Sequence, residues 1–97
     1  MIRSFKNAGT EAIYNGVNTK EARRICPQKL WGVAVRKLDM LDVAASLTDL
    51  RAPPGNRLEA LTGDRSGRYS IRINEQYRIC FVWTDLGPEE VEITDYH

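Results

Sequence analysis

Four side chains in the second half of the sequence are of the types that break a phosphodiester bond of RNA. Glu59 can accept a proton, and His97, the only histidine, can release one near neutral pH. Arg72 and Arg78 can each hold phosphate through a planar fork of donors. RNA cleavage needs a base for the ribose 2′-OH, cations for the crowded transition-state charge and an acid for the departing 5′-oxygen. These side chains are therefore a candidate catalytic set that requires neither a cofactor nor a metal ion.

The end of the chain extends this set, because Asp95 and His97 are two positions apart. On a strand they share a face, where the carboxylate can orient or charge the imidazole. Tyr96 between them is a candidate ring for stacking on a base. A simpler interpretation is a terminal histidine in a frayed tail and a tyrosine in the core or at a sheet edge. Glu59 likewise can be a surface carboxylate paired with an arginine.

Positive charge is concentrated in the middle of the chain, although the formal net charge is only +1. Residues 51–80 contain six arginines and three acidic residues, whereas residues 81–97 contain five acidic residues and no lysine or arginine. This asymmetry marks the middle segment as an anion-binding surface. Three arginines of that segment are candidates to bind the phosphates that flank a cleavage site: Arg57, Arg65 and Arg68.

The length of 97 residues predicts a single domain over residues 1–97, with a small core and a marginal stability that a partner can increase. Cys26 and Cys80 are too few and too far apart for a disulfide framework or a zinc site, so free thiols are expected. The start has no signal-peptide pattern, and no apolar run is long enough to span a bilayer. We therefore expect a cytoplasmic protein without membrane contact.

Helices are expected in the first half of the chain, after a short alternating strand at residues 2–5. Residues 10–14 predict a short helix that ends at the following Asn-Gly pair, and Thr19 can cap a second helix that continues to residue 24. Residues 27–50 predict a long helix, which begins with proline and is stopped by the Pro-Pro-Gly sequence that follows. Its apolar stripe has five members: Leu30, Val33, Leu38, Leu41 and Ala45.

Strands are expected in the second half, at residues 57–61, 69–73, 77–83 and 90–96, with turn-forming residues between them. Short connections favour antiparallel neighbours. The predicted fold class is α+β, with an N-terminal strand and helices packed on one face of an antiparallel sheet.

The two central strands have a predicted register. Ile71 and Ile79 belong on the core face and should oppose each other, which leaves residues 74–76 as the connecting loop. Arg72 then opposes Arg78 on the open face, where two like charges destabilise a hairpin unless an anion lies between them. Neutralising either arginine should therefore stabilise the free domain slightly and abolish activity. Alternatively, the two side chains meet solvent or nearby carboxylates: Glu59, Glu90 or Glu92.

Four sequence blocks resemble the HigB-type branch of the RelE/ParE toxin superfamily. Residues 55–72, GNRLEALTGDRSGRYSIR, resemble its LxxLxGxxxGxxSIR block, and residues 77–81, YRICF, resemble its WRIxF strand. The opening MIRSFK is similar to the MIKSF start of these toxins, and the closing DYH is similar to their last three residues. The blocks occur in order along the whole chain. Within the HigB branch, the chain is similar to the GraT-like members.

This resemblance implies a RelE-like fold, ribosome-dependent cleavage of messenger RNA and a HigA-like antitoxin with a helix-turn-helix domain. Operator DNA is then bound only through the antitoxin complex, since this chain has no recognition-helix pattern. Arg78 matches the arginine that stabilises the transition state, and Glu59 matches the glutamate base of the YoeB relatives. The family's C-terminal catalytic group is matched by the closing residues: Asp95, Tyr96 and His97. Thr62 departs from the pattern, because a catalytic lysine often occupies that position.

Two other functions remain open for the same residues. Members of the ParE branch share this fold but poison DNA gyrase and lack the nuclease residues. A basic module that binds RNA or the ribosome would need no catalysis at all. Messenger RNA cleavage in a translating extract, compared with inhibition of supercoiling by purified gyrase, separates these functions.

Overall fold

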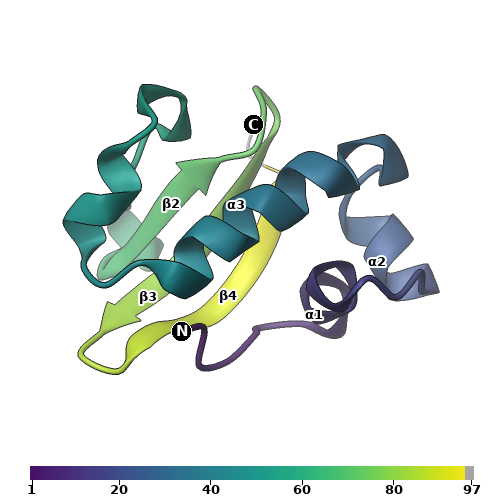
Figure 1. The fold of residues 1–97 in the computed structure, drawn as a ribbon, viewed down its shortest axis with the longest axis horizontal. Helices are drawn as coiled ribbons and strands as arrows, with labels where there is room; N and C mark the ends of the chain where they lie inside the picture. Colours follow the sequence, from purple (N-terminus) through teal and green to yellow (C-terminus); the bar gives the residue numbers. More distant parts are fainter. Residues whose placement is uncertain (96–97) are drawn as a thin grey trace.

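A four-stranded antiparallel sheet forms one layer of the protein (Figure 1). The computed structural model describes residues 1–95. The strands follow one another in space as they do in the chain: β1 (Glu59–Ala60), β2 (Arg68–Arg72), β3 (Tyr77–Thr84) and β4 (Gly87–Asp95). Tight connections produce this order, since strands joined by short loops pair antiparallel. The predicted α+β class is confirmed.

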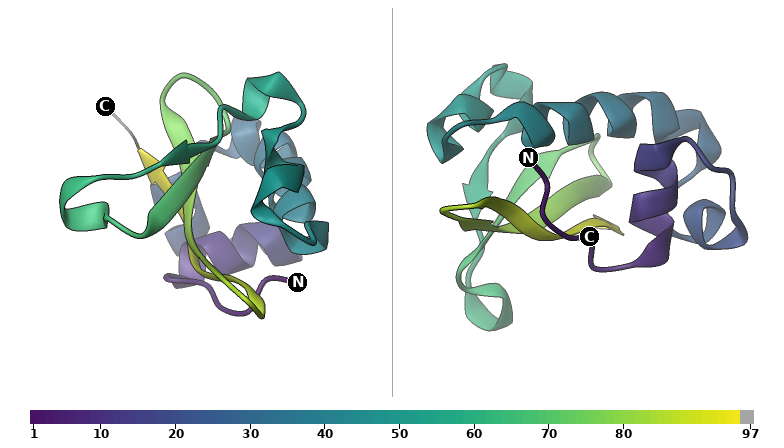
Figure 2. Two further views of the ribbon diagram at one scale, coloured as in Figure 1. Left: turned by 90° about the vertical axis from the view of Figure 1, so that its left-hand side faces the viewer. Right: turned by 60° about the horizontal axis from the view of Figure 1, so that its bottom comes forward.

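Three α-helices lie on one side of the sheet, α1 (Ala8–Asn15), α2 (Lys20–Ile25) and α3 (Trp31–Val43) (Figure 2). The two short helices form where the sequence predicted them, because their first turns are capped. Asn7 accepts from the Thr10 amide at 2.8 Å, and Thr19 accepts from the Ala22 amide at 3.0 Å. In residues 1–95, no helix is long and apolar enough to cross a membrane.

The core lies between α3 and the sheet. Alternation along β2 and β3 buries Ile71, Ile79 and Phe81 completely, and Leu38 and Leu41 of α3 are buried against the same cluster. The register is as predicted: Ile71 opposes Ile79, with Arg72 opposite Arg78 one position further along. This agreement is expected because successive side chains of a strand point to opposite faces. A slip of one residue in the pairing would therefore turn the whole apolar face toward solvent.

The first residues do not form the predicted strand at positions 2–5. Phe5 makes only an isolated parallel bridge with Val91. The flanking backbone bonds are Val91 N–H to the Ser4 carbonyl at 3.1 Å and Lys6 N–H to the Val91 carbonyl at 2.9 Å. The segment therefore runs beside β4, but α1 begins too soon after it for a ladder to develop.

The long helix predicted for residues 27–50 is wrong at both ends. A 3₁₀ turn, η1 (Gln28–Leu30), precedes α3, which already ends at Val43. A separate 3₁₀ helix, η2 (Leu47–Arg51), follows, because Ser46 and Asp49 form a capping box at its start. The Asp49 carboxylate accepts from the Ala45 and Ser46 amides at 2.9 and 3.2 Å. Ala45, expected in the apolar stripe, is consequently exposed.

The limits of the predicted strands also change, by one residue at β2 and β3 and by more at β1 and β4. β1 comprises only two residues instead of five, because the 3₁₀ turn η3 (Pro54–Asn56) leads into Arg57 with a left-handed φ of 45°. β4 begins at Gly87, three residues before the predicted start, so the hairpin turn is confined to positions 85–86. Gly87 has a φ of 128°, and a Cβ on it would lie 2.3 Å from the Met1 carbonyl oxygen.

Candidate active site

The sheet face that points away from the helices carries a cluster of polar side chains. The register places Ser70 opposite both Glu59 of β1 and Cys80 of β3, and Arg72 opposite Arg78. Opposed residues share a face of an antiparallel sheet. These five residues, Glu59, Ser70, Arg72, Arg78 and Cys80, are called the arginine face below.

Arg78 is largely buried on this face, with only 8% of its surface exposed. Its Nε donates to the Ser70 hydroxyl at 2.7 Å. Its Nη2 donates to the Arg57 carbonyl at 2.5 Å and to the Ser70 carbonyl at 3.4 Å, and its Nη1 lies 3.9 Å from Glu59 Oε1. These acceptors replace the water that burial removes. Arg78 therefore lies on the predicted face, away from the helices, but its side chain is buried there because Arg57 and Glu59 approach its guanidinium from the sheet edge.

The two opposed arginines turn to different partners. Arg72 Nη2 lies 3.9 Å from Glu75 Oε1 in the hairpin loop, whereas Arg78 faces Glu59. Each arginine of the pair therefore has a carboxylate nearby, which reduces the like-charge repulsion expected from the register. Binding of an anion between the two arginines stays a prediction. The alternative interpretation, in which Glu59, Glu90 or Glu92 meets these arginines, is confirmed for Arg78 with Glu59, whereas the partner of Arg72 is Glu75. Glu90 and Glu92 pair with Arg68 and Arg65.

The three arginines predicted to bind flanking phosphates have different surroundings. Arg65 Nη1 lies 3.6 Å from Cys80 Sγ and 4.0 Å from Glu92 Oε1, so it borders the arginine face. Arg68 Nη2 donates to Glu90 Oε1 at 2.8 Å. Arg57 offers its carbonyl to Arg78, while its own guanidinium has no ion pair or hydrogen bond with residues 1–95. Their role toward phosphate stays a prediction.

The predicted C-terminal group is only partly within the described residues. Asp95 is exposed and opposes Tyr77, one position beyond the Thr94–Arg78 pair, so its side chain belongs to the other side of β4 from Arg78. Asp95 Oδ2 accepts from the Gln76 side chain at 3.1 Å. Tyr96 and His97 lie outside the described residues. The structure therefore does not bring Asp95 directly to Arg78.

Ser70 is a member of the arginine face that sequence reasoning missed, as is Cys80 opposite it. It is fully buried, and its hydroxyl and carbonyl both accept from Arg78. The predicted register contained the signal, since it places Ser70 two positions before Arg72 and therefore on the same face. A small hydroxyl residue beside an arginine pair is a natural acceptor for a guanidinium.

Cys80 lies at the centre of the face but is unsuited to nucleophilic attack. Burial is the main cause that raises the pKa of its thiol, so the thiol remains neutral at physiological pH. In the described part of the chain, no group of three or more His, Cys, Asp or Glu side chains is placed to hold a metal ion. Chemistry on this face would come from Glu59 as a proton acceptor and from the guanidinium groups as charge stabilisers.

Comparison with known proteins gives these residues a family context. Residues 3–97 match the family model for the RelE-like toxin of the type II toxin-antitoxin system HigB. The chain belongs to the HigB-like toxin family. This confirms the resemblance found in the sequence, and the helices on one side of a four-stranded antiparallel sheet agree with a RelE-like fold. Membership in a type II system also implies an antitoxin partner.

Curated relatives carry the same family name. Toxin HigB-1 of Vibrio cholerae is 41% identical over 85 residues, which cover 88% of this chain and 86% of that protein. Endoribonuclease HigB of Proteus vulgaris is 28% identical over 102 residues, across the full length of both proteins. An uncharacterized protein of Haemophilus influenzae is 46% identical over 55 residues, covering 57% of this chain and 54% of that protein.

Proposed function

We propose that this HigB-like toxin is a metal-independent endoribonuclease that cleaves messenger RNA on the ribosome and thereby inhibits translation. The observation that carries the proposal is the position of the Arg78 guanidinium, fixed by three acceptors with its Nη1 3.9 Å from the Glu59 carboxylate. A preorganised cation beside a carboxylate is the arrangement that transesterification of RNA requires. The full-length similarity to a protein named Endoribonuclease HigB supports the same reaction class.

Each step of the proposed reaction has a side chain assigned to it. Glu59, half exposed at the short edge strand β1, removes the proton from the ribose 2′-OH. The 2′-oxygen forms a bond to the adjacent phosphorus while the bond to the 5′-oxygen breaks, and Arg72 and Arg78 stabilise the added negative charge. His97 returns a proton to the departing 5′-oxygen, with Asp95 and Tyr96 as its proposed partners. The products are a 2′,3′-cyclic phosphate and a free 5′-hydroxyl.

Product analysis tests this mechanism directly. A translating extract receives the purified toxin and a defined messenger RNA, and the new ends are mapped and tested for a cyclic phosphate. Glu59→Gln should reduce cleavage by about 10²–10⁴. The same toxin with purified RNA, without ribosomes, tests ribosome dependence. Intact messenger RNA together with inhibition of purified gyrase would replace the proposal with the ParE-like function.

The antitoxin is proposed to bind away from the arginine face and to leave it open. Among residues 1–95, four large apolar side chains are exposed: Met1 at 70%, Val17 at 51%, Val43 at 79% and Leu86 at 69%. Met1 and Leu86 border a hollow of about 250 Å³ together with Trp83, near the end of β3 that is remote from Arg78. Exposed apolar side chains around a hollow, as Met1 and Leu86 are here, suit a protein contact. A HigA-like, helix-turn-helix antitoxin would also provide the contacts to operator DNA.

Hydrogen exchange with and without the antitoxin distinguishes binding away from the arginine face from direct coverage of that face. Binding at the remote end should protect the backbone around Val43 and Leu86 and leave β2 and the start of β3 unchanged. Strong protection around Arg72 and Arg78, without protection at the remote end, would mean that the antitoxin covers the site directly.

A further inference from the structure

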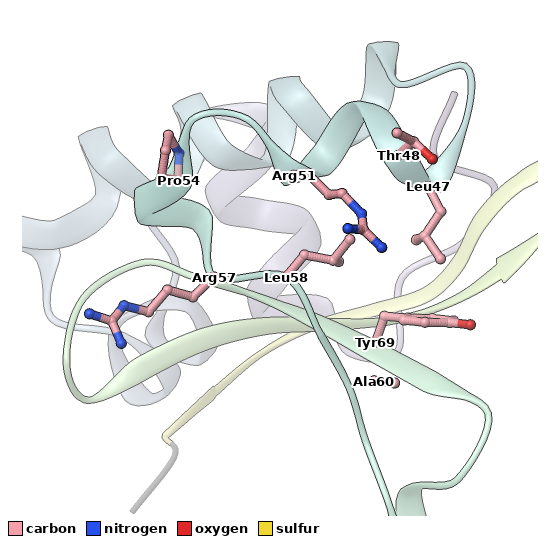
Figure 3. Close-up of a pocket in the computed structure, with 8 residues that line it drawn as sticks. All are labelled: Leu47, Thr48, Arg51, Pro54, Arg57, Leu58, Ala60 and Tyr69. Carbon is pink, nitrogen blue, oxygen red and sulfur yellow. The ribbon is translucent and has the colours of Figure 1, made fainter.

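A cavity of about 400 Å³ lies on the opposite side of β1 from the arginine face. It is lined by η2, by the segment that leads from η3 to β1, and by the first residues of β2, and it is open to solvent on one side (Figure 3). The residues of its wall that matter for binding are Leu47, Thr48, Arg51, Arg57, Leu58 and Tyr69. Its volume is within the range of small-molecule sites. None of its lining residues is acidic.

The two arginines of this cavity differ from the other arginines in their segment. In residues 51–80, four arginines pair with a carboxylate: Arg65, Arg68, Arg72 and Arg78. Arg51 and Arg57 are exposed, and neither guanidinium has an ion pair or hydrogen bond within residues 1–95. The positive charge of the segment is therefore least compensated at this cavity. An anion at this position would encounter cations that no internal carboxylate has neutralised.

The cavity also has an apolar wall, which a phosphate ion would not contact favourably but which an aromatic base could pack against. Figure 3 shows Arg51 extending from η2 toward Leu58, above the Tyr69 ring, whereas the Arg57 guanidinium lies at the other end and points away from Arg51. Tyr69 is half-buried and stacks on Phe81 with ring centroids 6.3 Å apart, which holds the ring in place. A guanidinium and a fixed aromatic and aliphatic surface that line the same cavity suit a nucleotide, with a phosphate for the cation and a base for the apolar wall.

The cavity and the arginine face meet at the edge of the sheet. β1 has only two residues, and Glu59 and Ala60 point to opposite sides of it: Glu59 pairs with Ser70, and Ala60 pairs with Tyr69 at the cavity. Arg57, which lines the cavity, gives its carbonyl to Arg78 of the arginine face. A single extended strand could thus pass around β1 and contact both sites.

We infer that this cavity binds one nucleotide of single-stranded RNA next to the cleavage site, with its phosphate on Arg51 and its base against Tyr69 and Leu58. The inference rests on the proposed function for the identity of the ligand as RNA. It adds a subsite that the catalytic set does not contain, and it assigns Arg51 and Tyr69 a role in substrate binding.

Binding of a fluorescently labelled 2′-O-methyl RNA octamer tests the inference, because this probe has no 2′-OH and cannot be cleaved by the proposed mechanism. Arg51→Gln should weaken binding and reduce the slope of log affinity against log salt by about 0.7, the value for one phosphate contact on a single strand. Tyr69→Leu should weaken binding roughly tenfold, whereas Tyr69→Phe should bind like the wild type. Arg24→Gln is the matched control, since Arg24 is exposed on α2.

The outcomes for the subsite and for the enzyme are separable. If wild type cleaves messenger RNA but Arg51→Gln binds the octamer like wild type, the subsite is wrong and the proposed function stands. Equal losses in Arg51→Gln and Arg24→Gln, or no binding by wild type, also overturn the subsite. Arg51-dependent binding by a chain that cleaves no messenger RNA supports the subsite alone. If Arg51→Gln instead loses only its antitoxin, the cavity is a protein contact. Thermal unfolding checks that each variant is folded.

Discussion

Arg78→Gln is expected to destabilise the free domain, because the Arg78 guanidinium is part of the fold as well as the candidate active site. The substitution would remove charged donors from the Ser70 hydroxyl, 2.7 Å away, and from the Arg57 carbonyl, 2.5 Å away. Ser70 is fully buried and cannot readily obtain water in exchange. Arg72→Gln provides the matched comparison, since Arg72 occupies the opposed position of the same hairpin.

The magnitudes follow from the contacts. A hydrogen bond to a charged group contributes about 1.5–3 kcal/mol, and glutamine can restore part of two such bonds, so Arg78→Gln should cost about 2–3 kcal/mol. This would lower the melting temperature by roughly 10–20 °C in a domain of this size. Arg72→Gln removes only a long ion pair with Glu75, whose side chain is 95% exposed. It should therefore lower the free energy of unfolding by less than about 1 kcal/mol.

Thermal and urea unfolding of the two variants without antitoxin provide the measurement, with cleavage in a translating extract as the second readout. Arg72→Gln should remain folded yet lose cleavage if its cation stabilises the transition state. Similar melting temperatures for the Arg78→Gln variant and wild type would refute the reasoning and would restore the earlier expectation, in which removal of either charge relieves repulsion.

Further predictions concern the chain end, a close backbone contact and a buried thiol. Removal of His97, which leaves a chain ending at Tyr96, should lower cleavage by about 10²–10⁴ without changing thermal stability; a folded truncation that arrests growth as wild type does would exclude His97 from catalysis. Gly87→Ala should unfold at a lower temperature than Gly55→Ala, since a Cβ would collide with backbone at the first position and meets nothing within 4 Å at the second. Burial raises the pKa of Cys26 to about 11, so the folded state retains the thiol proton where the unfolded chain has lost it. The free energy of unfolding should therefore fall as pH rises from about 8.5 to 11, and the fall should be smaller in Cys26→Ala than in wild type. Chemical unfolding measured across this pH range tests both expectations.

Local patterns in the sequence were sufficient for the two short helices and for the central hairpin. Asn7 and Thr19 satisfy the amides of the first turns, and apolar alternation in β2 and β3 sets which residues face the core. The early end of α3 was also readable, because Ser46 and Asp49 are spaced for a capping box that begins a new helix. These features depend on residues a few positions apart, or on a period that one strand shows by itself.

Tertiary structure decided which side chains meet. The register brought Arg72 opposite Arg78, but the burial of Arg78 depends on Arg57 and Glu59, which lie about twenty positions earlier in the chain. The cavity likewise combines residues of η2, β1 and β2, and Arg51 lacked any local signal that distinguished it from other arginines. Partners of a charged side chain depend on contacts between distant segments and on the water they exclude, and neither is encoded in the spacing of neighbouring residues.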